Sequence, residues 1–237
     1  MNITIYEYMM AALAVLAAAA IYSSGVSVLP HFAVIVAVAS LADFLISHFA
    51  FREKILPKSA IITGMIIALI LSPSSALWMQ VAVPLTAIIS KHAIKAKTNV
   101  FNPAAFALLA GGFFGAFPAW WAASSLLALP LGLFISWKIR KLEISLSFLA
   151  VYLVMFVLFR HIDPLSEMLG SAALFLAFFM ATEPKTTPSS KNGKIVFGIL
   201  LAFLALVIAF ALPGIDFLLA ALLIPNAAKS CKFAGLK

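Results

Sequence analysis

Charge is scarce in this sequence. Charged residues make up 10% of the 237 residues, whereas a soluble domain carries roughly 25%. Cysteine occurs once, as Cys231, which excludes an internal disulfide framework and a cysteine-ligated cluster within the chain. Hydrophobic residues make up 65% of the sequence, which predicts an integral membrane protein. The net charge of +8 then indicates membrane topology rather than nucleic-acid binding.

The usual marks of a metal or catalytic site are missing as well. The histidines, His31, His48, His92 and His161, show no paired helical spacing, so neither a zinc site nor a bis-histidine haem site is predicted. No glycine-rich phosphate loop and no Ser/His/Asp grouping occurs. The sequence therefore predicts no metal and no catalytic residue, and any electron transfer would require an organic cofactor or a partner's metal.

Apolar segments run through the whole chain and are separated by charged residues, prolines or glycines. Their approximate bounds are 8–22, 31–50, 59–72, 76–90, 103–117, 118–137, 144–160, 168–182, 195–212 and 215–228. The third would be roughly 21 Å long as a helix, shorter than the roughly 30 Å hydrocarbon core. Such short segments are typical of buried half-spans, so the sequence predicts about ten spanning or half-spanning helices.

The distribution of basic residues supports this count. With the N-terminus inside, all of the Lys and Arg residues except Arg160 fall in loops or tails on the inner side. The N-terminal run 8–22 follows a stretch without Lys or Arg, so we interpret it as a retained first span rather than a signal peptide. The expectation is a multi-pass protein of the plasma membrane with both termini in the cytoplasm.

A weak internal repeat points to the architecture. Residues 59–73 and 171–184 each begin with Ser-Ala, continue as a short apolar helix and end on a polar residue before proline. These are the third and eighth segments, five positions apart, and an odd offset makes the copies antiparallel. We therefore predict one membrane domain over residues 1–237, built as a five-plus-five inverted repeat with halves of about 1–117 and 118–237.

Two polar passages interrupt the apolar pattern, Lys91–Ala104 and Met180–Pro188. The predicted topology places both on the inner side, together with the helix starts at Ser59 and Pro103, whose free backbone N–H groups would point into the same region. Such a donor-rich hollow suits an electron-rich heteroaromatic ligand or an anion. The alternative is that the asparagines only cap helices and the lysines only set topology.

Asp43 is an acid at membrane depth, which makes it a candidate for handling ions or protons. Its expected partner is His48 or a nearby lysine such as Lys58. A buried, hydrogen-bonded carboxyl with no such role is the other interpretation. Asp216 follows Pro213-Gly214 and is expected to cap the last helix.

Asn99-Val-Phe-Asn-Pro-Ala104 and Met180-Ala-Thr-Glu-Pro-Lys-Thr-Thr-Pro188 resemble motifs of one membrane family. It comprises the D subunit of the Rnf electron-transport complex and the B subunit of the sodium-translocating NADH:quinone reductase. Further matches are Ser59–Gly64, Lys91, Gly198 and Asn226, so the similarity covers about residues 35–230. The resemblance implies a urea-transporter-like fold of ten helices, flavin cofactors, and electron transfer that some members couple to Na⁺ or H⁺ movement.

The resemblance also implies a noncovalent riboflavin near Asn99 and Asn102. Family members carry a Ser/Thr-Gly-Ala-Thr motif at which FMN is attached, but residues 105–170 contain none, so covalent FMN is not expected. We expect riboflavin or FMN to be bound noncovalently, with other redox membrane subunits and lipid as partners. The residues expected to bind the flavin are Thr63, Lys91, Asn99, Phe101, Asn102, Pro103, Thr182, Glu183, Pro184 and Thr187.

The main hypothesis is thus an electron-transfer subunit within a larger oxidoreductase rather than a stand-alone enzyme. A channel or carrier for a small solute, such as a vitamin or a urea-like molecule, is the alternative, because the same fold serves both purposes. It would need a continuous pore lined by Thr63 and Thr182. A scaffold subunit that has lost its cofactor is a third hypothesis.

Overall fold

The computed structural model describes residues 4–52, 56–94, 98–122, 127–160, 163 and 172–234, and within these ranges the protein is built of helices. The α-helices are α1 (Ile5–Ser24), α2 (Leu29–Phe51), α3 (Lys58–Ile70), α4 (Leu77–Ala93), α5 (Pro103–Gly112), α6 (Ala128–Lys138), α7 (Leu142–Arg160), α9 (Ala172–Phe175), α10 (Lys191–Ala211) and α11 (Phe217–Ala234). A 3₁₀ turn, η1 (Val26–Val28), precedes α2, and a π-helical turn, η2 (Leu176–Met180), extends α9. The predicted all-helical class is confirmed.

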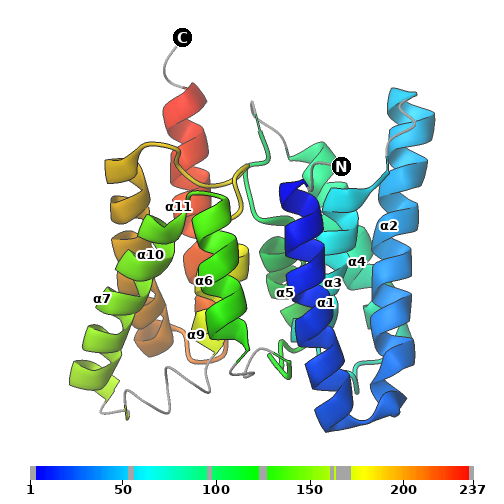
Figure 1. Ribbon diagram of the computed structural model, residues 1–237, viewed down its shortest axis with the longest axis horizontal. Helices are drawn as coiled ribbons and strands as arrows, with labels where there is room; N and C mark the ends of the chain where they lie inside the picture. The colour runs from blue at the N-terminus through cyan, green and yellow to red at the C-terminus, as the bar shows by residue number, and fades with distance from the viewer. Residues whose placement is uncertain are drawn as a thin grey trace.

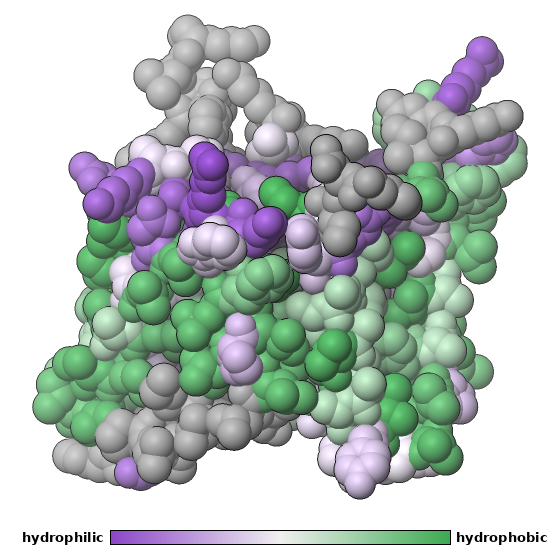
Figure 2. Space-filling model, viewed as in Figure 1, coloured by the Kyte–Doolittle hydropathy of each residue, from purple (hydrophilic) through white to green (hydrophobic). Residues whose placement is uncertain are grey.

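Among the described residues, four helical stretches are long and apolar enough to cross a membrane. They are α1, Val26–Phe51, α7 and α10, with mean hydropathies between 1.7 and 2.7. The helices α3 and α5 are apolar but shorter, as the prediction of half-spans required. In Figure 2 hydrophilic side chains gather at one end of the molecule and hydrophobic ones cover the surface below it. These features make the chain a multi-pass membrane protein.

Helices α1 to α5 form one side of the molecule in Figure 1, and α6 to α11 form the other. Within the first group α2 packs against α3 and α4, and within the second α7 packs against α10. Contacts of α1 with α6 and of α5 with α11 join the two groups. The beginning of α1 and the end of α11 lie at the same end, which the hydrophilic side chains of Figure 2 mark as the polar end.

The end of α3 lies inside the protein, where its last carbonyl groups need hydrogen-bond donors. Ile70 O accepts from Ala119 N at 2.8 Å and from Trp120 N at 3.0 Å, and Leu69 O accepts from Ala122 N at 3.3 Å. The non-helical segment before α6 therefore satisfies the backbone of this half-span, as an apolar environment requires.

That segment corrects two predicted boundaries. The sequence predicted helices over 103–117 and 118–137, but α5 ends at Gly112 and α6 begins at Ala128. The physical reason is the glycine-rich end of α5, where Gly115 has a φ of +89°, a backbone conformation that breaks a helix. The backbone N–H groups of Ala119, Trp120 and Ala122, which are not in a helix, then donate to the last carbonyl groups of α3.

Close helix packing depends on one glycine in particular. A Cβ atom at Gly198 of α10 would lie 2.6 Å from Ile144 O and 2.1 Å from Ser147 Oγ of α7. Small residues let helix backbones approach one another in membrane proteins, where van der Waals packing drives association. Gly198 therefore fixes the distance between α7 and α10.

Candidate functional site

The two polar passages meet at the polar end through a buried amide pair. Asn102 caps α5 by accepting from Ala105 N at 3.0 Å, and its Nδ2 donates to Met180 O at 3.3 Å. Asn226 of α11 accepts from Asn102 N at 3.0 Å and donates to Thr186 O at 3.2 Å. The expectation that the two passages lie together at one end is confirmed, and Asn226 is the residue that joins them.

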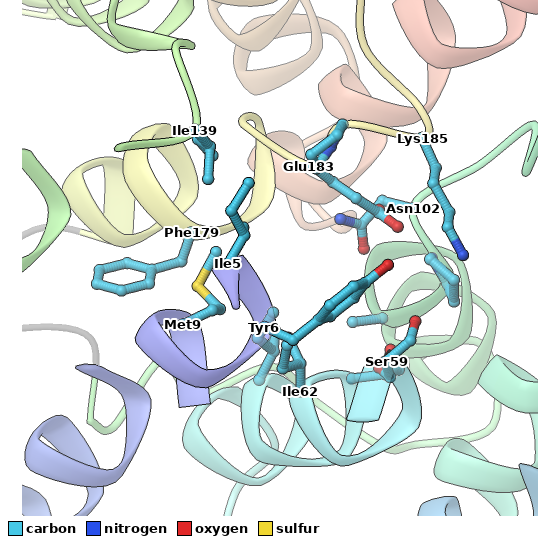
Figure 3. A pocket seen from close by; sticks show the side chains of 15 residues that line it. Ile5, Tyr6, Met9, Ser59, Ile62, Asn102, Ile139, Phe179, Glu183 and Lys185 are labelled. Carbon is cyan, nitrogen blue, oxygen red and sulfur yellow. Dashed lines mark hydrogen bonds between the residues drawn. The ribbon is translucent and has the colours of Figure 1, made fainter. Parts of the chain in front are cut away.

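A cavity of about 280 Å³ lies beside this junction (Figure 3). It is lined by residues of α1, α3 and α5, by Ile139 after α6, by Phe179 and by the segment Glu183–Lys185. Most of its wall is apolar, formed by side chains such as Met9, Ile62 and Ile66. Its volume is close to the lower end of the range for small-molecule sites, roughly 300–1,000 Å³.

Polar groups gather at one end of the cavity. In Figure 3 the Tyr6 hydroxyl, the Glu183 carboxyl and the Asn102 amide lie toward that end with Lys185, whereas Phe179 lies at the other. Within the described part of the chain, neither the Tyr6 hydroxyl nor the Lys185 ammonium has a hydrogen-bond partner. Both are therefore available as donors to a ligand.

Glu183 sits in the non-helical segment between η2 and α10. Burial raises the pKa of its carboxyl to about 7, against the opposite influence of nearby Lys185 and a weak hydrogen bond from Thr186 Oγ1 at 3.4 Å. At neutral pH this carboxyl is therefore present in both its charged and its neutral form.

Half of the predicted flavin-binding residues line this cavity, namely Thr63, Asn102, Pro103, Glu183 and Pro184. Thr63 Oγ1 donates to Ser59 O at 3.0 Å, one turn back in α3. Asn102 already uses its amide to hold the junction, so it shapes the cavity more than it offers a free donor.

The other five predicted residues do not line the cavity. Hydroxyls of two threonines instead hold the turn after η2, with Thr182 Oγ1 donating to Phe178 O and Thr187 Oγ1 to Glu183 O, each at 2.7 Å. Phe101 stacks on Phe106 with 5.6 Å between ring centroids.

Asn99 is also outside the cavity lining, although it is buried. Its Nδ2 has no hydrogen-bond partner among the residues that the structure describes. Of the residues Lys91, Asn99, Phe101 and Asn102, which were all expected to bind the flavin, Asn102 alone lines this cavity.

Lys91 instead forms a buried ion pair with Asp43. Its Nζ lies 2.9 Å from Asp43 Oδ1, and His92 Nε2 lies 2.7 Å from the same oxygen. A lysine partner of Asp43 is thus confirmed, but the residues named for it, His48 and Lys58, are wrong. The packing of α2 against α4 decides the pairing, and Lys58 binds Glu7 at 2.7 Å.

The contribution of α1 to the cavity was missed in the sequence. Glu7 accepts from Thr4 N at 2.7 Å and from Lys58 Nζ at 2.7 Å, which fixes the first turn of α1 beside α3. This places Tyr6 and Met9 in the cavity wall. The Thr4-x-x-Glu7 pattern is a helix-start signal that locates this turn, but only the tertiary contact with Lys58 directs it to the site.

Comparisons with known proteins identify the sequence family of this chain. A sequence model of the NQR2, RnfD, RnfE family matches residues 3–120 and 109–230. A protein from Methanosarcina acetivorans, named as the D subunit of an ion-translocating oxidoreductase complex, is 29% identical over 226 residues, covering 84% of this chain and 77% of that protein.

Proteins of the same name from Haemophilus species match over shorter stretches. The one from Haemophilus ducreyi is 33% identical over 105 residues, which is 41% of this chain and 30% of the relative. The one from Haemophilus influenzae is 32% identical over 76 residues, 32% of this chain and 21% of the relative. The matched part therefore spans less than a third of either Haemophilus protein. Since the family model matches nearly the whole sequence, the chain belongs to the NQR2, RnfD, RnfE family.

Proposed function

We propose that the chain is a membrane subunit of an ion-translocating oxidoreductase complex and binds a flavin noncovalently in the cavity at its polar end. Relatives named as the D subunit of such a complex support the first part. The observation that carries the second part is the cavity itself, an apolar slot with hydrogen-bonding groups at one end.

The chemistry of the lining fits an isoalloxazine ring. That ring is flat and largely apolar, and its pyrimidine edge carries carbonyl and N–H groups. Ile62, Ile66 and Phe179 would pack against the flat part, while the Tyr6 hydroxyl and the Lys185 ammonium would donate to the polar edge. A bound flavin supplies the capacity to accept and pass on electrons, and the protein supplies binding, orientation and electrostatics.

Positive charge near the polar edge would favour electron acceptance by a ligand there. Lys185 lines the cavity directly, and Lys91 and Lys229 lie close enough to influence Glu183 electrostatically. A cationic surrounding stabilises negative charge on a ligand more strongly in a buried site than in water. These side chains would therefore stabilise the reduced form of the ligand relative to its oxidised form.

The alternative of a solute channel receives less support. Further along α3, away from the polar end, Ile67 and Ile70 are completely buried, as is Phe175 of α9. The end of α3 is also covered by the segment that caps it. This dense packing below the cavity favours a closed cofactor site over a continuous pore lined by Thr63 and Thr182.

We further propose that the chain is a five-plus-five inverted repeat with its polar end in the cytoplasm. In support, α1 and α3 of the first half pack together, as do α6 and η2 of the second. In Figure 1 α1 runs away from the polar end and α6 runs toward it. The basic residues are concentrated in the segments of the polar end, which supports placing that end in the cytoplasm. The membrane would then be the plasma membrane. Other redox subunits of the complex would bind to this chain.

Purification in mild detergent tests the cofactor proposal. The protein should be yellow, absorb near roughly 450 nm, and release riboflavin or FMN on denaturation, identified by mass spectrometry. Noncovalent binding predicts that the flavin separates fully from the polypeptide. Colourless protein that also fails to bind added riboflavin and FMN would refute the proposal.

A further inference from the structure

Most acidic side chains described at the polar end are neutralised by a lysine. Each of the three following pairs joins two different helices or helix starts. Glu7 lies 2.7 Å from Lys58, Asp43 lies 2.9 Å from Lys91, and Glu143 lies 3.1 Å from Lys194. These carboxylates keep a fixed negative charge at neutral pH, because an adjacent cation stabilises the ionised form.

Glu183 differs from these three acids. In the described ranges no lysine or arginine forms an ion pair with it, and among those residues its carboxylate accepts a side-chain hydrogen bond from the Thr186 hydroxyl alone, at 3.4 Å. It also lines the cavity, and in Figure 3 its carboxyl points toward Asn102 and the Tyr6 hydroxyl. An acid that is enclosed, unpaired and aimed at a ligand cavity can gain and lose a proton there at little cost.

Charged and titratable groups reach Glu183 from several elements. Lys185 comes from its own segment, Lys91 from α4, Lys229 from α11 and Tyr6 from α1. The lysines favour the carboxylate, whereas burial favours the neutral acid and outweighs them, so the pKa of Glu183 is raised from 4.5 to about 7. A further negative charge in the cavity would shift the balance toward the neutral acid.

We propose that Glu183 is the proton-exchange group of the cavity and compensates the charge of its ligand. This rests on the proposed function, in which a redox partner of the complex delivers electrons to the bound flavin. When negative charge enters the cavity, a Glu183 carboxylate oxygen takes a proton from water at the polar end and forms an O–H bond. When the charge leaves, that bond breaks and the proton returns to water, while Glu183 itself gains and loses no electrons.

Proton uptake during electrochemical reduction of the riboflavin-loaded protein tests this proposal. At about pH 7.5 the wild type should take up more protons per flavin than Glu183→Gln, by up to one. Glu183→Asp should restore part of the difference, since it keeps a carboxyl. Glu143→Gln is the matched control, because it removes an acid already paired with Lys194, and it should behave as the wild type.

An infrared titration of the ligand-free protein supplies a readout independent of electron transfer. A protonated carboxyl band should fade between about pH 6 and about pH 8 in the wild type and in Glu143→Gln, but not in Glu183→Gln. Two results would overturn this proposal and leave the proposed function intact. One is riboflavin binding with equal proton uptake in the wild type and Glu183→Gln, and the other is the absence of a carboxyl band that disappears in Glu183→Gln. Failure to bind riboflavin would overturn the proposed function as well.

Discussion

Replacing Asp43 with asparagine should destabilise the protein far more than removing a surface ion pair. The side chains of Lys91 and Asp43 are only 10% and 8% exposed, so the substitution leaves an uncompensated buried ammonium. His92 loses its carboxylate partner at the same time. Breaking a buried pair from one side costs about 3–5 kcal/mol, because the remaining charge keeps its desolvation penalty. For a chain of this size that corresponds to a fall in Tm of roughly 6–20 °C.

The exposed pair Glu7–Lys58 supplies the matched control. Its side chains are 35% and 33% exposed, so Glu7→Gln should cost about 0–1 kcal/mol. Thermal unfolding in detergent, followed by circular dichroism, compares the two variants. Adding Lys91→Gln to Asp43→Asn removes the orphaned charge and should recover part of the loss. An Asp43→Asn variant as stable as Glu7→Gln, or a double variant less stable than the single one, would refute the reasoning.

Three further results are expected. Gly198→Ala should destabilise the protein by about 1–3 kcal/mol in the same assay, because its Cβ would lie 2.6 Å from Ile144 O; an unchanged Tm would contradict the α7–α10 packing. Asn226→Leu leaves Asn102 N and Thr186 O without partners and should cost about 1–3 kcal/mol for each unsatisfied group, whereas Asn226→Asp should retain the bond to Asn102 N. Because burial raises the pKa of Glu183 from 4.5 to about 7, its contribution to stability is complete below pH 4.5 and is lost as the pH rises through 7. The Tm of the wild type should therefore fall relative to Glu183→Gln over that interval, and parallel curves would show that the carboxyl is not buried as described.

The sequence predicted the placement of the two polar passages, which topology alone decides. Counting spans and basic loops placed the passages containing Asn102 and Glu183 at the same end, and hydrogen bonds through Asn226 join them there. This succeeded because each passage adjoins a half-span, and the direction of a short helix follows from the number of crossings before it.

Side-chain directions could not be predicted in the same way. His48, five residues after Asp43, lies about 140° around the helix, so it points to another face, whereas Lys91 reaches Asp43 only through the packing of α2 on α4. Tyr6 and Met9 were missed because they look like ordinary residues of a first span. Their place in the cavity depends on the contact of α1 with α3.

The boundaries between residues 112 and 128 failed for a related reason. An apolar, aromatic stretch favours a span by hydropathy, but α3 ends inside the protein and its carbonyl groups need donors. The backbone of Ala119 and Trp120 meets that need only if it leaves the helical conformation. The glycines near the end of α5 permit this break, but the need for donors at the end of α3 arises only in the tertiary structure.

The central claim, that the cavity at the polar end holds a flavin, is tested most directly by filling the cavity. Ser59→Trp adds an indole to its lining, while Ser74→Trp makes the same change at an exposed serine outside it. Quenching of riboflavin fluorescence should give equal affinities for the wild type and Ser74→Trp, and at least a tenfold loss for Ser59→Trp, about 1.4 kcal/mol. Equal binding by all three proteins would contradict the account.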